Sequence, residues 1–144
     1  MADRSVADQQ ELAFLTALPP RTAKLATVRA DGRPHLAPVW FDLDSDGALV
    51  FNTGASTVKG RNLQRDPRAS ICVDDDRTFS FVVVEGVAEI SDDLDDVRRW
   101  ATRLGGRYMG DARAEEYGAR NGAAGELVVR LRPARIVSAF NTAD

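Results

Sequence analysis

The sequence predicts a mainly β protein of the α+β class, a β-barrel of about six antiparallel strands with short peripheral helices. Three observations lead to this prediction. Six or seven short segments rich in β-branched and aromatic residues follow one another closely. Tight-turn signals such as Asp31-Gly32 separate several of them, as in antiparallel hairpins. Finally, a chain of 144 residues with so much strand is better closed into a barrel, which hides the strand edges.

The first predicted elements are a short helix and a three-stranded meander. Leucines at three-residue spacing favour a helix over residues 8–18, and Pro19-Pro20 ends it. The hydrophobic period then changes to that of strands. Two turn signals, Asp31-Gly32 and Ser45-Asp46-Gly47, divide the next stretch into strands at residues 23–30, 34–44 and 48–53.

A second short helix and two further strands follow. Ser56 or Thr57 can cap a helix that runs to about residue 64. Strands are then predicted at residues 69–73 and 79–90. Gly86, in the middle of the longer strand, indicates a bulge or bend of the kind that barrels need at their corners.

The C-terminal part predicts two helices and two strands. Ser91 and several aspartates mark the start of a helix, because negative charge is favoured there, and Gly105-Gly106 marks its end. One apolar stripe on that helix contains Leu94, Val97, Trp100, Ala101 and Leu104. A short helix around residues 111–120 is followed by strands at 126–131 and 135–140, with Pro133 at a bend between them.

The composition indicates one cytoplasmic domain that spans residues 1–144. The formal net charge is −3, so an anion site has to come from local clustering of Lys and Arg. Cys72 is the only cysteine, which excludes an internal disulfide or a zinc site built on cysteines. No apolar run approaches the ~20 residues of a membrane helix, and the first residues lack a signal-peptide pattern. We expect no metal, nucleic-acid or membrane partner.

The usual catalytic groupings are absent from the sequence. His35 is the only histidine, so there is no histidine metal cluster and no convincing nucleophile–base pair. Neither standard glycine-rich phosphate loop occurs. If the protein is an enzyme, we therefore expect a cofactor to supply the reactive group while the chain binds and orients it. His35, Tyr108 and Tyr117 are candidate proton donors, and the sequence does not choose among them.

Residues 56–63 are suited to bind a phosphate. They follow a predicted strand and begin a helix, where free N–H groups and the helix dipole attract an anion. The polar groups available there are those of Ser56, Thr57, Lys59 and Asn62. Arg61 and Arg65 lie one turn apart on another face and can serve a second anionic group. The alternative interpretation is a capped surface helix whose basic residues are simply solvated.

Five short motifs occur in a recognisable order: LATVRADGRPH (residues 25–35), PVWF (38–41), KGRNL (59–63), DPRAS (66–70) and VEG (84–86). Their order and spacing resemble the pyridoxamine 5′-phosphate oxidase-like superfamily. Within it, the chain is most similar to the flavin/deazaflavin oxidoreductases, which often use coenzyme F420. The resemblance runs from about residue 12 to residue 140, nearly the whole chain.

The resemblance implies a split β-barrel homodimer with two cofactor sites at the subunit interface. It implies that the residue 38–41 strand lies along a tricyclic ring, and that Phe79 or Phe81 of the partner subunit covers that ring. From the strand alone, Trp40 is equally compatible with a place in the core. The cofactor-binding residues expected are Pro38, Val39, Trp40, Phe41, Thr53, Ser56, Thr57, Lys59, Arg61, Asn62 and Phe79.

The resemblance implies F420 as the cofactor, with FMN as the alternative. F420 has the longer and more anionic tail, which calls for positive charge beyond the phosphate. The candidates for that charge are Arg29, Arg33, Arg61, Arg65 and Arg68. The expected activity is hydride transfer between reduced F420 and a small unsaturated organic substrate.

Three alternatives remain at this point. They are an FMN-dependent oxidoreductase or flavin reductase, a non-catalytic cofactor-binding protein, and a haem protein. Oxidation of vitamin B6 is not expected, because the chain departs from the true oxidase: it is shorter and shows no C-terminal Arg and His pattern.

Overall fold

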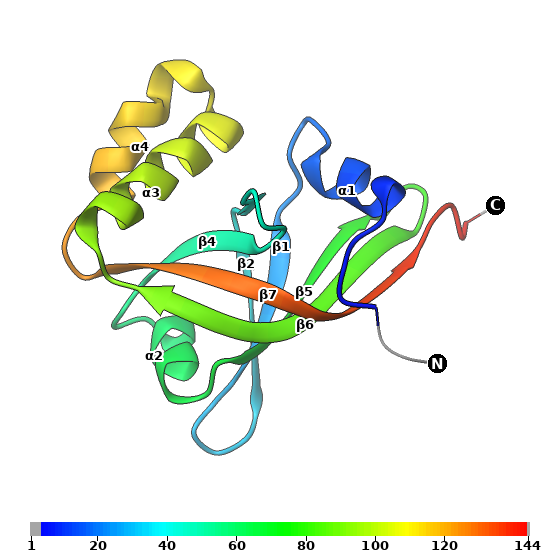
Figure 1. Cartoon of the computed structure of the whole chain (residues 1–144), viewed down its shortest axis with the longest axis horizontal. Coiled ribbons are helices and arrows are strands. Elements are labelled where there is room, and N and C mark those ends of the chain that lie inside the picture. The colour runs from blue at the N-terminus through cyan, green and yellow to red at the C-terminus, as the bar shows by residue number, and fades with distance from the viewer. Residues whose placement is uncertain (1–3, 144) are drawn as a thin grey trace.

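Antiparallel strands form the framework of the protein, whose computed structural model describes residues 4–143 (Figure 1). The seven strands are β1 (Ala23–Val28), β2 (Pro34–Val39), β3 (Asp42–Leu43), β4 (Leu49–Gly54), β5 (Arg68–Asp75), β6 (Ser80–Ser91) and β7 (Glu126–Ala139). They form one sheet in the order β2-β1-β5-β6-β7-β4-β3, in which every neighbouring pair is antiparallel.

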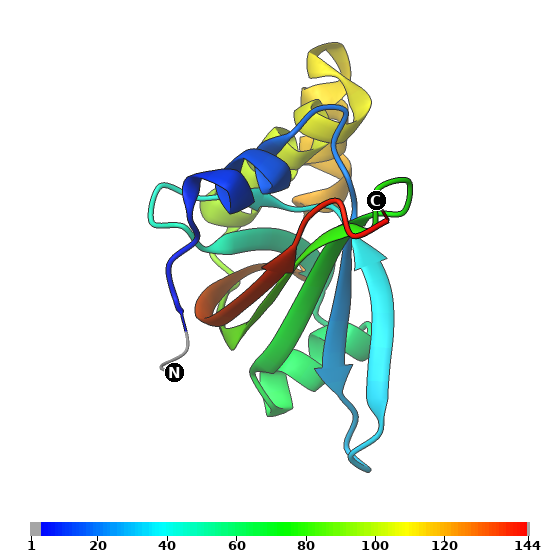
Figure 2. The same cartoon turned by 90° about the vertical axis from the view of Figure 1, so that its right-hand side faces the viewer.

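The order of the strands requires the sheet to curl. β2 and β3 stand at opposite ends of the order, yet only Trp40 and Phe41 separate them in the chain. Three peptide steps span at most about 11 Å, so the two edges come close together. The 90° view in Figure 2 shows the strands curving round rather than lying in one plane. The predicted mainly β fold is thus confirmed as an incomplete barrel, with seven strands among the described residues rather than about six.

β6 and β7 form the longest antiparallel pair of the sheet, although α3 and α4 separate them in the chain. The ladder between them shifts register between Glu85 and Gly86, which confirms the bulge predicted at Gly86. A Cβ at Gly86 would lie 2.0 Å from the Arg132 carbonyl oxygen, so the bulge needs a glycine. The two strands predicted at the C-terminus are in fact the single strand β7. Pro133 faces Gly86 across the bulge, where its missing N–H costs least because the ladder is already interrupted.

Four α-helices and one 3₁₀ turn surround the described part of the sheet. They are α1 (Gln9–Thr16), α2 (Val58–Arg65), α3 (Leu94–Met109), the turn Asp111–Arg113 and α4 (Ala114–Asn121). α3 starts from Asp93, whose side chain caps the Asp96 N–H, rather than from Ser91. The helix also continues through Gly105-Gly106 and ends at Gly110, whose φ is 96°. The predicted end at Gly105-Gly106 was therefore wrong.

Two clusters of buried side chains hold these elements together. The larger fills the inside of the curled sheet, where Leu25, Phe41 and Phe51 are completely buried and α1 contributes Leu15. The smaller joins α3 to the other face of β4 and β7, and consists of Val50, Val97, Trp100 and Val128. The prediction that Trp100 belongs to the core is confirmed.

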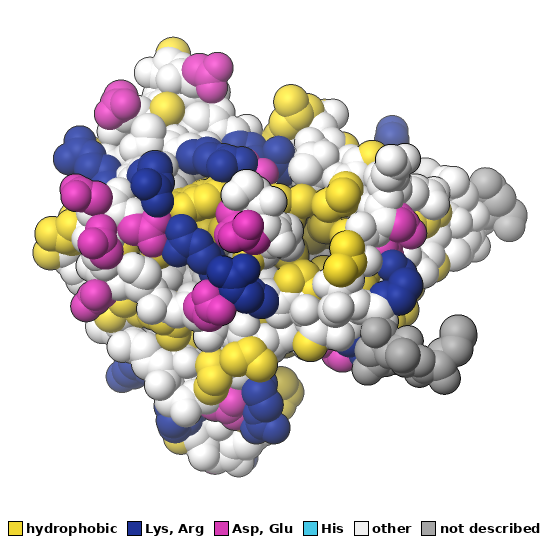
Figure 3. Space-filling model, in the orientation of Figure 1, with side chains coloured by type: hydrophobic (Ala, Val, Ile, Leu, Met, Phe, Trp, Pro, Cys, Tyr) yellow, Lys and Arg dark blue, Asp and Glu magenta, His cyan; other side chains and the backbone are white. Residues whose placement is uncertain are grey.

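Charged side chains of both signs share the surface. On the face shown in Figure 3, blue and magenta side chains lie beside one another. Ion pairs such as Arg130–Asp96 (2.8 Å) and Arg132–Glu89 (2.7 Å) join neighbouring elements. α2 differs, because its sequence VKGRNLQR carries three cations and no carboxylate. None of the helices in residues 4–143 has the length and apolar character that crossing a membrane would require.

Candidate functional site

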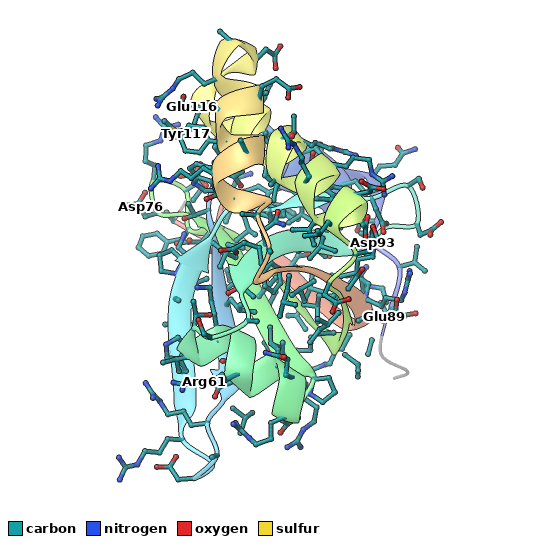
Figure 4. The ribbon with its side chains drawn as sticks, turned by 90° about the vertical axis from the view of Figure 1, so that its left-hand side faces the viewer. Arg61, Asp76, Glu89, Asp93, Glu116 and Tyr117 are labelled. Carbon is teal, nitrogen blue, oxygen red and sulfur yellow. The ribbon has the colours of Figure 1, made fainter. Side chains whose placement is uncertain are left out.

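A cavity of about 520 Å³ opens between strands from the two ends of the strand order and two helical regions. Its walls come from the end of β2, the end of β4, α2 and the α3–α4 pair. The lining residues are Thr22, Pro38, Val39, Trp40, Asn52, Thr53, Gly54, Lys59, Ala101, Leu104, Tyr117, Arg120, Asn121 and Glu126. In Figure 4, Tyr117 on α4 and Arg61 on α2 stand at opposite ends of the molecule with strands between them.

Five of the residues expected to bind a cofactor meet on the wall of this cavity. They are Pro38, Val39, Trp40, Thr53 and Lys59. They come from three separate segments of the chain, and β-sheet pairing alone does not join them: β2 and β4 are far apart in the strand order. The curl of the sheet brings them together.

The other expected residues lie elsewhere. The Phe41 side chain is fully buried in the core, and its backbone N–H and carbonyl already bond to Tyr108 and Arg107. Asn62 is also buried, donating to Thr27 Oγ1 (3.0 Å) and accepting from Arg65. Ser56 and Thr57 are exposed and do not line the cavity.

Arg61 and Phe79 also lie outside this cavity. Arg61 lines a separate hollow of about 360 Å³ together with Arg29 and Arg65. Phe79 is 63% exposed, in the loop between β5 and β6, where its φ is 50°.

Thr57 explains how the start of α2 is held against β4. Its Oγ1 accepts the Gly60 N–H (3.1 Å) and donates to the Gly54 carbonyl (2.8 Å). Since that hydroxyl proton is used, the 3.1 Å contact with Thr53 Oγ1 is donated by Thr53. Thr57 thus serves as the helix cap and retains no donor for a ligand.

Lys59 is the cation that this arrangement presents to the cavity. Within residues 4–143 its ammonium makes no hydrogen bond or ion pair, although most other basic side chains of the protein are paired. It projects from the first turn of α2, where the helix dipole adds positive potential. An unneutralised cation in a hollow attracts an anionic group.

Asn52 adds an unsatisfied acceptor to the same wall. Its Nδ2 donates to the carbonyls of Val97 and Leu127 (3.3 and 3.4 Å). Its Oδ1 is buried and has no hydrogen-bond partner among the described residues. A buried acceptor without a partner is costly unless a ligand supplies a donor. The wall therefore fits a ligand that carries both an anionic group and N–H or O–H donors.

Trp40 forms the aromatic side of the cavity. Its ring stacks on Tyr108 with centroids 5.2 Å apart and nearly parallel planes, and meets the edge of Tyr117 at 5.5 Å. Tyr108 anchors this group, because its hydroxyl donates to the Arg21 carbonyl (2.7 Å) and accepts the Phe41 N–H. Burial raises the pKa of the Tyr108 phenol, so it stays protonated in this structural position.

The structure distinguishes the three candidate proton donors by their surroundings. Tyr117 lines the cavity, whereas Tyr108 is occupied by backbone groups and His35 lines no part of it. His35 lies on β2 opposite Thr27, with a buried Nδ1 that has no partner among residues 4–143.

Sequence reasoning missed several lining residues. Asn52, Arg120, Asn121 and Glu126 carry no local signal, since each is an ordinary member of a strand or helix pattern. Only the pairing of β4 with β7, which places Gly54 opposite Glu126, brings the end of α4 to the cavity. No pattern within one segment could have found them.

A curled antiparallel half-barrel with a cationic, aromatic cavity at the end of its β2 and β4 strands defines a class of small-molecule binding proteins. The chain belongs to the pyridoxamine 5′-phosphate oxidase family, whose family model matches residues 8–138. This match confirms the superfamily suggested by the sequence motifs.

Two of the similar proteins are reductases by name. The 5a,11a-dehydrotetracycline/5a,11a-dehydrooxytetracycline reductase of Streptomyces rimosus subsp. rimosus is 29% identical over 138 residues, covering 90% of this chain and 80% of the relative. A solved structure described as an F420 reductase is 26% identical, with a TM-score of 0.75 and coverage of 92% and 98%.

A conserved hypothetical protein from Mycobacterium tuberculosis is also similar in structure. It is 30% identical, with a TM-score of 0.80 over 99% of this chain and 89% of that chain. Taken together, the comparisons support a flavin-type oxidoreductase.

Proposed function

We propose that the protein is an oxidoreductase that uses F420, or less favourably FMN, to transfer a hydride to or from a small unsaturated organic substrate. The observation that carries this proposal is the meeting of Lys59, Asn52 and Trp40 on one cavity wall. They offer a cation for a phosphate, an acceptor for a ring or ribityl donor, and an aromatic surface for a flat ring. The F420 reductase and the tetracycline-type reductase among the relatives support the same class of reaction.

When bound, the reduced cofactor supplies the hydride, and the chain supplies position and environment. Lys59 binds the phosphate and fixes one end of the ligand. Asn52 Oδ1 accepts a hydrogen bond that fixes its register along the cavity. Val39 and Trp40 exclude water from the adjoining ring face, which protects a reactive hydride from solvent.

The surroundings of α2 favour F420 over FMN. On the far side of the helix from Lys59, Arg29, Arg61 and Arg65 line the hollow of about 360 Å³. Within residues 4–143 the side chains of Arg29 and Arg61 form no hydrogen bond or ion pair, in contrast to the paired arginines of α3. A tail more anionic than a single phosphate finds its partners there, and FMN has no such tail.

A homodimer is part of the proposal. The outer face of the sheet carries a hollow of about 660 Å³ between β1, β5, β6 and β7, and exposes Leu36, Val87 and Val137. Exposed apolar surface of this kind marks an interaction site. Phe79 does not reach the cavity of its own chain, so in the dimer it serves the site of the other copy. Light scattering at micromolar concentration tests this arrangement: we expect twice the monomer mass, and a monomer would contradict it.

The central experiment is a titration of the purified protein with F420 and with FMN. We expect the protein to bind F420 more tightly than FMN. We also expect Lys59→Ala to raise the dissociation constant at least tenfold, because a charge-assisted contact is worth about 1.5–3 kcal/mol. Arg99→Ala is the matched control, since Arg99 is an exposed cation paired with Asp96 outside the cavity. Equal affinity of wild type and Lys59→Ala would remove Lys59 from the site, and tighter binding of FMN would reassign the cofactor.

A further inference from the structure

Among the described residues that line the cavity, Glu126 alone is acidic. It is the first residue of β7, directly after the loop that follows α4, and it lies opposite Gly54 at the end of β4. The same loop is joined to the segment before α2, because the Gly125 carbonyl accepts the Ala55 N–H (2.8 Å). Glu126 therefore lies where the α2 side and the α4 side of the cavity meet.

The Glu126 carboxylate is left without a protein partner. Within residues 4–143 it forms no hydrogen bond or ion pair, whereas Glu85, Glu89 and Glu116 each pair with an arginine. A Cβ at Gly54 would lie 3.6 Å from one oxygen of the Glu126 carboxylate and 3.9 Å from the other. Because Gly54 has no side chain, both oxygens lie beside bare backbone on the cavity wall, where a ligand can reach them.

Asn52 supplies a second acceptor on the same face of the sheet. Side chains two residues apart on a strand share a face, so Asn52 lies on the face of Gly54, and the pairing of β4 with β7 adds Glu126 to it. Diagonal neighbours of this kind lie about 7–8 Å apart, so one ligand segment can reach both. Both amide hydrogens of Asn52 are donated to the carbonyls of Val97 and Leu127. A flipped amide would set oxygen against those carbonyls, so Oδ1 stays the unpartnered atom.

We propose that Glu126 and Asn52 select the cofactor by the hydroxyl groups of its linker, the polyol chain that joins the ring to the phosphate. This inference rests on the proposed function and deepens it, because it assigns residues to the part of the ligand between ring and phosphate. A carboxylate accepts hydrogen bonds from two neighbouring hydroxyls at once, and acidic residues bind the ribose hydroxyls of dinucleotides by the same chemistry. A linker without hydroxyls leaves both acceptors unpaired, which costs affinity.

The charge of Glu126 makes this role testable. Lys59 on the same wall attracts an anionic ligand, whereas a carboxylate repels one. A carboxylate that made no hydrogen bond to the ligand would therefore only weaken its binding. Removal of the Glu126 charge consequently changes the affinity in opposite directions in the two cases.

Calorimetric titration of the full chain with F420 measures the direction of this change. Glu126→Gln keeps the shape of the side chain and breaks no protein hydrogen bond. We expect it to raise the dissociation constant at least fivefold, because hydroxyls bond more strongly to a carboxylate than to an amide. Glu89→Gln is the matched control, since Glu89 is an exposed acid paired with Arg132 outside the cavity, and its affinity should stay within twofold of the wild type. An unchanged or lower dissociation constant in Glu126→Gln would overturn the inference, as would an equal loss in Glu89→Gln.

A ligand without the hydroxyls completes the test. F420 synthesised with a pentyl linker in place of the ribityl chain keeps the ring, the phosphate and the tail. We expect the wild type to bind this analogue at least tenfold more weakly than F420, and Glu126→Gln to leave the affinity for the analogue unchanged or to raise it. If Glu126→Gln weakened both ligands equally, Glu126 would not bind the hydroxyls and the inference would fall. Failure of the proposed function gives a different result, because neither F420 nor FMN would then bind the wild type.

Discussion

Gly60 shows how much of the site depends on a single missing side chain. A Cβ at this position would lie 2.1 Å from the Gly54 carbonyl oxygen, a backbone atom that cannot rotate away. Gly60 therefore allows the first turn of α2 to rest directly on the end of β4, and this contact places Lys59 at the cavity. The close approach, rather than an unusual backbone angle, is what requires glycine here.

Gly60→Ala should consequently destabilise the protein and weaken anion binding at once. We expect the free energy of unfolding to fall by about 2–3 kcal/mol, the usual cost of forcing extra volume into a packed contact. Chemical denaturation measures the loss, and the F420 titration measures the displaced lysine. Gly32→Ala serves for comparison, because its Cβ would meet nothing within 4 Å and only its φ of +87° adds strain. Equal effects of the two substitutions would show that the α2–β4 contact is unimportant.

Single residues also show what local reasoning can and cannot predict about the site. Lys59 and Thr53 were predicted from the strand–helix junction and the family resemblance, and both line the cavity. Asn62 lies on the same helix, but its amide is buried against Thr27 of β1. Spacing along a helix says which residues are neighbours, whereas burial depends on the strand that packs against the helix.

At the scale of elements, the α3–α4 pair depends on close helix packing. A Cβ at Gly105 would lie 2.5 Å from the Cβ of Tyr117, so α4 can approach α3 only because residue 105 is glycine. The next residue, Gly106, has more room: its Cβ would be 3.3 Å from Ala114 and Asp111 side-chain atoms. Gly105-Gly106 was predicted to end the helix, because a glycine needed for packing looks the same in sequence as a glycine that ends a helix.

This difference predicts unequal effects of two adjacent substitutions on the free energy of unfolding. Gly106→Ala should be close to neutral, since alanine gains up to about 1 kcal/mol of helix propensity against a contact that needs only a small shift. Gly105→Ala should cost about 2 kcal/mol net, because the clash with Tyr117 exceeds that gain. It should also move the ring of Tyr117, which lines the cavity, and so weaken F420 binding. Thermal unfolding and calorimetry measure the two effects, and equal stability of the two variants would contradict the packing argument.

The strands were easier to predict than their ends. Period-two patterns and turn signals located β1, β4, β5 and β6 to within two residues at each end, because those signals are local. The single strand predicted at residues 34–44 was wrong, because it consists of β2 and β3 with Trp40 and Phe41 between them. β7 was predicted as two strands, because Pro133 normally interrupts a ladder. The bulge at Gly86 tolerates Pro133, because the ladder is already interrupted there. Gly86 lies 47 residues away from Pro133 in the chain, so no local pattern could reveal this compensation.

For the whole molecule, the N-terminal segment is tied across the sheet by a buried charge. The Arg4 carbonyl accepts the Ile136 N–H of β7 (2.8 Å), and its guanidinium makes two 2.8 Å bonds to Glu11 of α1. Glu11 is completely buried and also completes the capping box with Asp8. The hydrogen bonds from Arg4 lower the pKa of Glu11 to about 2, although desolvation acts in the opposite direction.

This shift predicts how stability depends on pH. A carboxyl whose pKa is lowered in the folded state stabilises the protein above its unfolded pKa, which for Glu11 is 4.5. That contribution is lost as the pH falls from about 4.5 towards 2. We expect it to be roughly 2 kcal/mol, less than the full shift implies, because the Arg4 side chain is 48% exposed and solvent weakens the pair.

Other carboxylates with lowered pKa values, such as Asp66 beside Arg68 and Asp96 beside Arg130, lose their contributions in an overlapping range. Wild type must therefore be compared with Glu11→Gln, which keeps the shape and removes the titration. The difference in unfolding free energy should be largest at pH 6–7 and shrink steadily below pH 4.5, as denaturant unfolding at each pH would show. A difference that stays constant down to pH 2.5 would mean that Arg4 and Glu11 contribute through packing alone, without electrostatic stabilisation.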